Sequence, residues 1–135
     1  MRSFGYLAME LAPIKNVFVV EDFLPVRARL IEMLNEIEGV RIVGEAATPT
    51  DAVNGILRTH PQYVLLDFQL EGGTATDILC SLRSRFPKTI FIVLTNHVQP
   101  QFRQVCMEAG ADFFLDKSSE IDKVKDVLAG MQADT

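Results

Sequence analysis

The chain has 135 residues, of which 48% are hydrophobic and 23% charged, and its formal net charge is -5. This composition is typical of one soluble globular domain and excludes a disordered chain. The acidic balance argues against direct binding of nucleic acid, because phosphate backbones attract basic surfaces. No apolar run approaches the roughly eighteen residues of a membrane span, so we expect no membrane association.

We expect one domain over residues 15–130, with an N-terminal tail at 1–14 and a C-terminal tail at 131–135. The apolar segment 4–12 is broken by Glu10 and lacks the cleavage site of a signal peptide. The cysteines are Cys80 and Cys106, and neither has a second Cys or His at ligand spacing. We therefore expect two core thiols in a reducing cytoplasm.

Short apolar runs alternate with amphipathic stretches along the chain. Strands are predicted, in chain order, at 17–20, 40–44, 63–66, 89–94 and 113–115. A stretch with apolar residues at helical spacing follows each strand; the first has Val26, Leu30 and Leu34. Continuous apolar strands separated by helices indicate a parallel sheet covered on both faces. The predicted fold class is α/β, a single doubly wound (βα)5 domain with a five-stranded parallel sheet, flavodoxin-like.

Several element boundaries carry local signals. Thr48 followed by Pro49 predicts a helix N-cap and the first helical residue. Gly110 predicts the end of the fourth helix, and the segment 119–122 resembles a capping box for the fifth. The glycine pair at 72–73 predicts a loop after the third strand.

Reactive side chains stand where the predicted strands end. They are Glu21 and Asp22 after the first strand, Asp67 after the third, Thr95 after the fourth and Lys117 after the fifth. In an open doubly wound sheet, ligands bind at the carboxyl ends of the strands. We therefore expect three carboxylates, a hydroxyl and an ammonium to meet at one edge.

The residue types at this edge predict a particular chemistry. Clustered carboxylates repel one another, and hard oxygen ligands without His or Cys favour Mg²⁺ over Zn²⁺. Lys117 and Thr95 offer a positive charge and a hydroxyl donor, both suited to phosphoryl oxygens. A carboxylate can itself attack phosphorus. The pattern therefore predicts metal-assisted acceptance of a phosphoryl group on a carboxylate.

This set of residues resembles the receiver domain of two-component response regulators. That family has an acid pair after strand one, an acceptor Asp after strand three, a Ser or Thr after strand four and a Lys after strand five. The stretch 109–117 is especially similar to the family's fifth-strand motif, and the resemblance covers residues 16–130.

The resemblance implies that Asp67 accepts a phosphoryl group from a sensor histidine kinase or a phosphotransfer protein, and that Thr95 and Lys117 contact its oxygens. The implied Mg²⁺ ligands are Asp22, Asp67 and the backbone carbonyl of Gln69, with Glu21 assisting through water. Such a domain is a phosphoacceptor that signals to a downstream protein, unknown here. It is not an enzyme beyond autophosphorylation and autodephosphorylation.

The resemblance also implies a switch, in which Phe114 couples to Thr95 and changes the surface made by helix four, strand five and helix five. Phe113, facing the opposite way, is the better candidate for a purely structural core residue. Gln69 and His97 each lie two residues past a site residue, so we expect them to tune the lifetime of the phosphoryl group. Ordinary solvated loop residues remain the alternative for that pair.

Two positions depart from the family pattern. Glu71 stands where a Pro is frequent, which leaves the geometry of that loop open, and Ser118 replaces the Pro that commonly follows the lysine. Two other functions share elements of this pattern. A flavodoxin-like binding module would need a phosphate-binding loop after strand one, and a metal-dependent aspartyl phosphatase would need a second acid at position 69. The chain begins with Met, which favours a stand-alone receiver over a fragment of a longer regulator.

Overall fold

Residues 14–130 are described by a computed structural model, and apart from Ile14 both expected tails lie outside them. One parallel sheet has the strand order β2-β1-β3-β6-β7. Its strands are β1 (Lys15–Val20), β2 (Val40–Ala46), β3 (Tyr63–Leu66), β6 (Ile90–Thr95) and β7 (Phe113–Asp116). The five-stranded parallel sheet confirms the predicted fold class.

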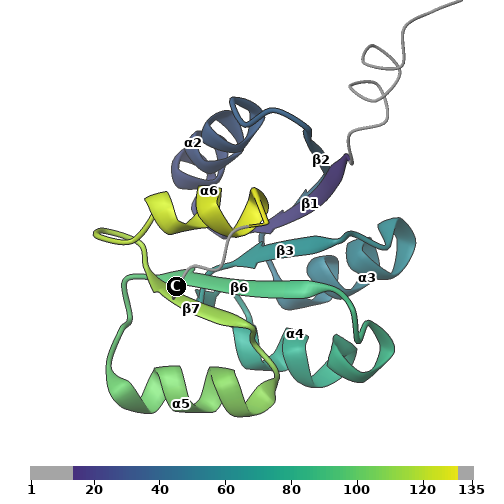
Figure 1. The fold of residues 1–135 in the computed structure, drawn as a ribbon. Helices are drawn as coiled ribbons and strands as arrows, with labels where there is room; N and C mark the ends of the chain where they lie inside the picture. The colour runs from purple at the N-terminus through teal and green to yellow at the C-terminus, as the bar shows by residue number, and fades with distance from the viewer. Residues whose placement is uncertain (1–13, 131–135) are drawn as a thin grey trace, which may run out of the picture.

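Helices cover both faces of this sheet (Figure 1). One face carries α2 (Leu24–Asn35) and α6 (Asp122–Leu128). The other carries α3 (Pro49–Thr59), α4 (Ala75–Leu82) and α5 (Pro100–Ala109), and a single 3-10 turn (Arg83–Arg85) extends α4. Among the described residues, no helix is long and apolar enough to cross a membrane.

Each face of the sheet has its own apolar core, because successive strand residues point in opposite directions. Along β1, Val17 and Val19 pack toward α2 and α6, whereas Phe18 and Val20 pack toward the other three helices. All four side chains are almost completely buried. Burial on both faces explains why the strand reads as an unbroken apolar run.

The cysteine prediction is only half right. Cys106 on α5 is buried, and burial raises the pKa of its thiol to about 11. Cys80 on α4 is exposed, so the expectation of two core thiols is wrong for this residue. It follows Leu79 in the helix, and the helical period turns it away from the core that buries Leu79 and Leu82.

Two of the predicted helix boundaries are confirmed and one is wrong. The Thr48 hydroxyl accepts a hydrogen bond from the Asp51 amide, and Gly110 caps α5 with a φ of 115°. At 119–122 no capping box forms, because α6 begins only after Ile121. The carboxylate of Glu120 instead accepts hydrogen bonds from the Asp116 amide and the Lys123 ammonium.

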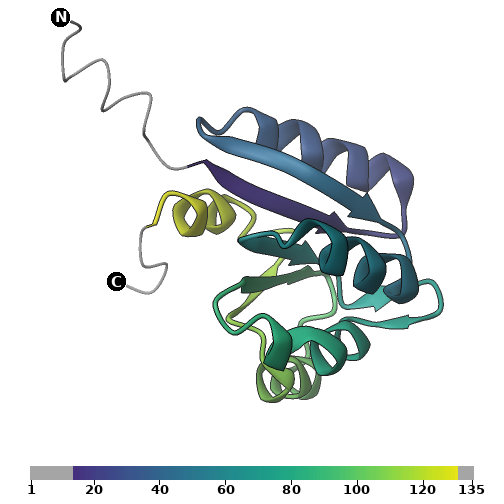
Figure 2. The same ribbon diagram turned by 90° about the vertical axis from the view of Figure 1, so that its right-hand side faces the viewer.

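The segment after β3 is a small hairpin rather than the plain loop predicted at 72–73. Strands β4 (Gln69–Leu70) and β5 (Gly73–Thr74) pair antiparallel, and Gly72 turns the chain with a φ of 89°. In Figure 2 the hairpin projects from the side of the molecule toward which the arrows of β1 and β2 point. Burial of Leu70 anchors it to the core of α3, α4 and α5.

Candidate acidic site at the carboxyl edge of the sheet

The parallel sheet brings the predicted site residues to one edge. Glu21 and Asp22 follow β1, Asp67 follows β3, Thr95 ends β6 and Lys117 follows β7. Neighbouring strands β1 and β3 are held in register at this edge, where the Asp67 amide donates to the Val20 carbonyl over 3.1 Å. The Lys117 amide likewise donates to the Thr95 carbonyl over 2.9 Å.

The Lys117 ammonium joins two of the carboxylates. Its Nζ donates to Glu21 Oε1 over 2.6 Å and to Asp67 Oδ2 over 3.1 Å. The Glu21 side chain is only 3% exposed and that of Lys117 is 14% exposed. Because the ion pair is largely shielded from water, the two charges interact more strongly than a surface pair would.

Burial and the ion-pair contacts have opposite effects on the protonation of this pair. Desolvation raises the pKa of Glu21, and the hydrogen bonds from Lys117 and the Phe23 amide only partly oppose it. Burial also disfavours the charge on Lys117, but its contacts with Glu21 and Asp67 outweigh that effect and raise its pKa. Lys117 is therefore a fixed positive charge at neutral pH.

The three acids form a set that suits a hard cation. One carboxylate oxygen each from Glu21, Asp22 and Asp67 lies within 4.8 Å of the others. Opposite ligands in a Mg²⁺ shell are about 4 Å apart, because each Mg–O bond is about 2.1 Å. Oxygens this close together can surround one small cation, directly or through a bound water molecule. Asp22 is the exposed member of the set and Glu21 the buried one.

Asp67 and Thr95 are held by local contacts at the same edge. Asp67 Oδ1 accepts from the amide of Phe68, while the other oxygen faces Lys117. Thr95 is fully buried, and its hydroxyl oxygen accepts from the His97 amide over 3.1 Å. That hydroxyl keeps its own proton for another acceptor.

Phe114 packs on the opposite side of β7 from Phe113. Phe114 is buried in the core beneath α5, whereas Phe113 is half-buried on the side of α6. The expectation that Phe113 is the better core residue is therefore wrong, because β7 turns Phe114 toward the more enclosed face. Arg103 on α5 donates to the Phe114 carbonyl over 3.2 Å, and its guanidinium lies 5.9 Å from the Phe114 ring.

Gln69 and His97 are both exposed, on the β4 strand and on the loop after β6. His97 belongs to an aromatic cluster that the sequence did not reveal. Its ring lies 6.4 Å from that of Phe68 and 6.1 Å from that of Phe102, and the two phenyl rings are 4.8 Å apart. The sequence does show an aromatic residue, Phe68, directly after Asp67. Because this position was expected to lie in a loop, nothing in the sequence indicated that its ring packs against other rings.

The two departures from the family pattern are accommodated locally. Glu71 lies exposed at the turn of the β4–β5 hairpin. After Lys117, the Asp116 carboxylate accepts from both the amide and the hydroxyl of Ser118, and these hydrogen bonds lower the pKa of Asp116. Side-chain hydrogen bonds thus shape the loop where a proline is common.

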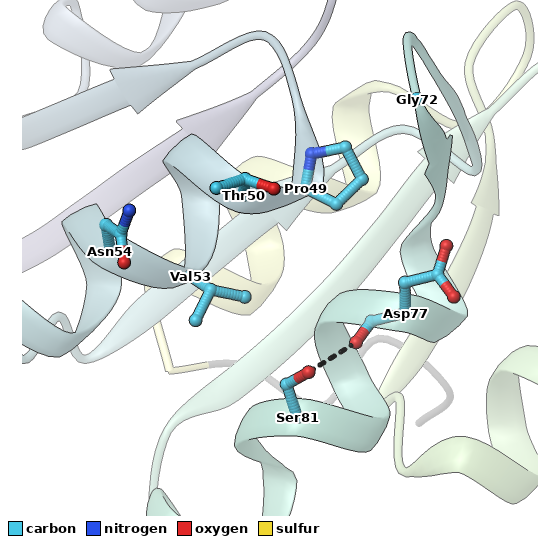
Figure 3. Close-up of a pocket in the computed structure, with 7 residues that line it drawn as sticks. All are labelled: Pro49, Thr50, Val53, Asn54, Gly72, Asp77 and Ser81. Carbon is cyan, nitrogen blue, oxygen red and sulfur yellow. Dashed lines mark hydrogen bonds between the residues drawn. The ribbon is translucent and has the colours of Figure 1, made fainter.

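A surface pocket lies between α3 and α4 and beside the hairpin (Figure 3). It is lined by Pro49, Thr50, Val53, Asn54, Gly72, Asp77 and Ser81. The hydroxyl of Ser81 donates to the Asp77 carbonyl within its own helix. The lining includes none of the predicted site residues.

Residues 17–129 match the family model of the response regulator receiver domain. The chain belongs to this family. Over 121 residues it is 27% identical to "Response regulator UvrY" of Escherichia coli K12, covering 87% of this chain and 56% of the relative. Over 119 residues it is 30% identical to the "DNA-binding transcriptional activator DevR/DosR" of Mycobacterium tuberculosis, covering 85% and 55%. The chain thus spans about half the length of these curated relatives.

Solved structures agree with the fold of this receiver. A LuxR-family DNA-binding response regulator from Staphylococcus aureus superposes with a TM-score of 0.80 at 18% identity, covering 87% of this chain and 98% of that one. The isolated REC domain of RcsB from Salmonella enterica serovar Typhimurium gives 0.77 at 20% identity, covering 88% and 91%. At these identities the likeness supports the fold alone.

Proposed function

We propose that this receiver accepts a phosphoryl group on Asp67 in a reaction that depends on Mg²⁺. The observation that carries the proposal is the contact of Lys117 Nζ with Asp67 Oδ2, beside the acids Glu21 and Asp22. A buried ammonium next to one nucleophilic carboxylate can neutralise charge as a phosphoryl group arrives. Among residues 14–130, neither of the two alternative functions has a comparable supporting contact.

In this proposal, Asp22 and Asp67 bind Mg²⁺ through their carboxylates and Gln69 through its backbone carbonyl, with Glu21 acting through water. When bound, Mg²⁺ neutralises negative charge on the phosphoryl oxygens and helps to orient the transferred group. The buried position of Glu21 against Lys117 and the exposed position of Asp22 support this division of roles.

The proposed transfer needs only one nucleophile from this chain. A carboxylate oxygen of Asp67 forms a bond to phosphorus while the bond from phosphorus to the donor nitrogen breaks, and the leaving imidazole keeps the electron pair. Lys117 donates a hydrogen bond to one phosphoryl oxygen, and the Thr95 hydroxyl donates to another. Both groups already stand at the carboxyl edge of the sheet.

The phosphoryl donor in this proposal is a sensor histidine kinase or a phosphotransfer protein, and residues 15–130 form the receiver unit. Phosphorylation then changes the surface made by α5, β7 and α6, where Phe114 lies beneath α5. A downstream protein that reads this surface completes the pathway. The curated relatives include a DNA-binding activator, but the acidic receiver itself is proposed to signal by protein contact.

Intact-mass measurement after incubation with acetyl phosphate and Mg²⁺ tests the proposal. Wild type should gain the mass of one phosphoryl group, and omission of Mg²⁺ should abolish the gain. Asp67→Asn should remain unmodified, whereas Asp126→Asn, which changes an exposed acid of α6, should behave as wild type. An unmodified wild type, with a kinase donor tried as well, would contradict the proposal.

A further inference from the structure

Within residues 14–130, Arg27 is the one residue of α2 whose side chain donates a hydrogen bond to the acidic turn after β1. Its Nη1 donates to the backbone carbonyl of Glu21 over 2.7 Å, and its Nε donates to Glu45 Oε1 over 2.7 Å. The Arg27 side chain is only 15% exposed. The guanidinium therefore joins the turn to the edge strand β2, on which Glu45 lies.

We propose that Arg27 is a positioning residue that holds the Glu21–Asp22 peptide group in the orientation required for Mg²⁺ binding. This inference rests on the proposed function and deepens it. The guanidinium binds the backbone of the turn, and its ion pair is with Glu45 rather than with the carboxylates of Glu21 or Asp22. It acts through the peptide and not as a ligand.

The geometry of the turn explains why this one hydrogen bond matters. The Glu21 amide donates to the Ala46 carbonyl over 3.0 Å, so that side of the residue is fixed by the sheet. The Glu21 carbonyl lies beyond the end of β1 and accepts its hydrogen bond from the Arg27 side chain. The carbonyl belongs to the peptide that leads into Asp22, so its rotation would redirect the Asp22 side chain.

Of the two interactions of Arg27, the hydrogen bond to the partly buried Glu21 carbonyl should be stronger than the ion pair with Glu45. A carbonyl that is partly buried on folding loses hydrogen bonds to water, and the hydrogen bond from the guanidinium replaces them. The Glu45 side chain is 49% exposed, and an exposed ion pair contributes little by itself. Glu45 therefore orients the guanidinium, and its loss should have the smaller effect on metal binding.

Calorimetric titration of the full chain with Mg²⁺ tests this role. Arg27→Ala should weaken Mg²⁺ affinity about tenfold, the usual effect of removing a group that orients a metal ligand. Arg27→Lys should recover part of the loss, because an ammonium can reach the carbonyl but lacks the fork that also engages Glu45. Arg29→Ala is the matched control, since Arg29 lies exposed on the same helix, and it should bind as wild type.

Hydrogen exchange of the Asp22 and Phe23 amides without metal provides the second measurement, and it should be faster in Arg27→Lys than in wild type. This variant carries the test if Arg27→Ala fails to fold. Wild-type Mg²⁺ affinity in Arg27→Ala, together with a lowered melting temperature, would overturn the inference. Arg27 would then contribute to the stability of the fold and not to metal binding. Absence of Mg²⁺ binding by wild type would instead overturn the proposed function on which the inference rests.

Discussion

Lys117 and Glu21 are 96 positions apart in the chain, yet the Lys117 Nζ lies 2.6 Å from Glu21 Oε1. Strands β1 and β7 are not neighbours, because β3 and β6 separate them in the sheet. The Lys117 side chain therefore reaches across the carboxyl edge and contacts Asp67 on the way. One ion-pair network ties together the first, third and last strands.

Removal of Lys117 should expose the cost of burying Glu21. In Mg²⁺-free buffer at neutral pH, Lys117→Ala should lower the free energy of unfolding by about 2 kcal/mol, because it leaves a buried carboxylate without its partner. The double variant with Glu21→Gln should regain part of that loss. Lys123→Ala removes the exposed partner of Glu120 and should cost about 0.5 kcal/mol or less.

Chemical denaturation of the four proteins measures these differences. Equal losses for Lys117→Ala and Lys123→Ala would contradict the importance assigned to burial of the Glu21 pair. A double variant that is less stable than Lys117→Ala would contradict the direct coupling between the two residues.

The candidate site could be predicted from the sequence because it depends on where strands end. A parallel sheet places every carboxyl end at one edge, so finding Asp67 and Lys117 after apolar runs was enough to bring them together. Contacts that depend on side-chain direction could not be predicted. The ring of Phe68 on Phe102, and the reach of Arg27 to the Glu21 carbonyl, need the backbone first.

The local errors have a similar origin. Residues 119–122 have the composition of a capping box, but the Ser119 amide, which such a box would pair with Asp122, donates instead to the Asp116 carbonyl. The glycines at 72–73 indicate a turn and not whether the flanking residues pair. Leu70 of the hairpin is buried in the core of α3, α4 and α5, a packing contact that the glycine pair does not reveal.

The two acids after β1 should differ in their importance for metal binding. Asp22→Ala should weaken Mg²⁺ affinity more than Glu21→Ala, because Asp22 is proposed as the direct ligand and Glu21 as one that acts through water. Calorimetric titration ranks the two variants, with Asp126→Ala as an exposed acidic control. The opposite ranking would show that the roles of the pair are reversed.

The switch proposed for Phe114 predicts where the structure changes. In the fluoroberyllate-bound form, hydrogen exchange should change within residues 95–128, because Phe114 is buried beneath α5 and Thr95 is buried at the end of β6. The Arg103 contact with the Phe114 carbonyl places α5 in the same region. Exchange should stay unchanged in the buried strand β1, and an unchanged 95–128 region would leave the switch without support.

Gln69 and His97 should affect how long the phosphoryl group survives. Gln69→Ala and His97→Ala should both still accept it, because neither side chain is a proposed ligand. Their decay rates after removal of the donor should differ from wild type by several-fold, or roughly 1 kcal/mol in the barrier to attack by water. The position of the His97 ring near Phe68, directly after Asp67, supports this expectation. If the decay curves of both variants superimpose on that of wild type, Gln69 and His97 are ordinary solvated loop residues.

The position of the phosphoryl group is the most direct test of Asp67 as the acceptor. Wild-type protein treated with acetyl phosphate and Mg²⁺ can be reduced with borohydride, which converts an acyl phosphate to an alcohol, and then digested for peptide mass analysis. We predict the reduced residue at position 67 alone, with no reduced residue in Asp67→Asn. Reduction at Glu21 or Asp22 in the wild type, or modification that persists in Asp67→Asn, would contradict Asp67 as the acceptor.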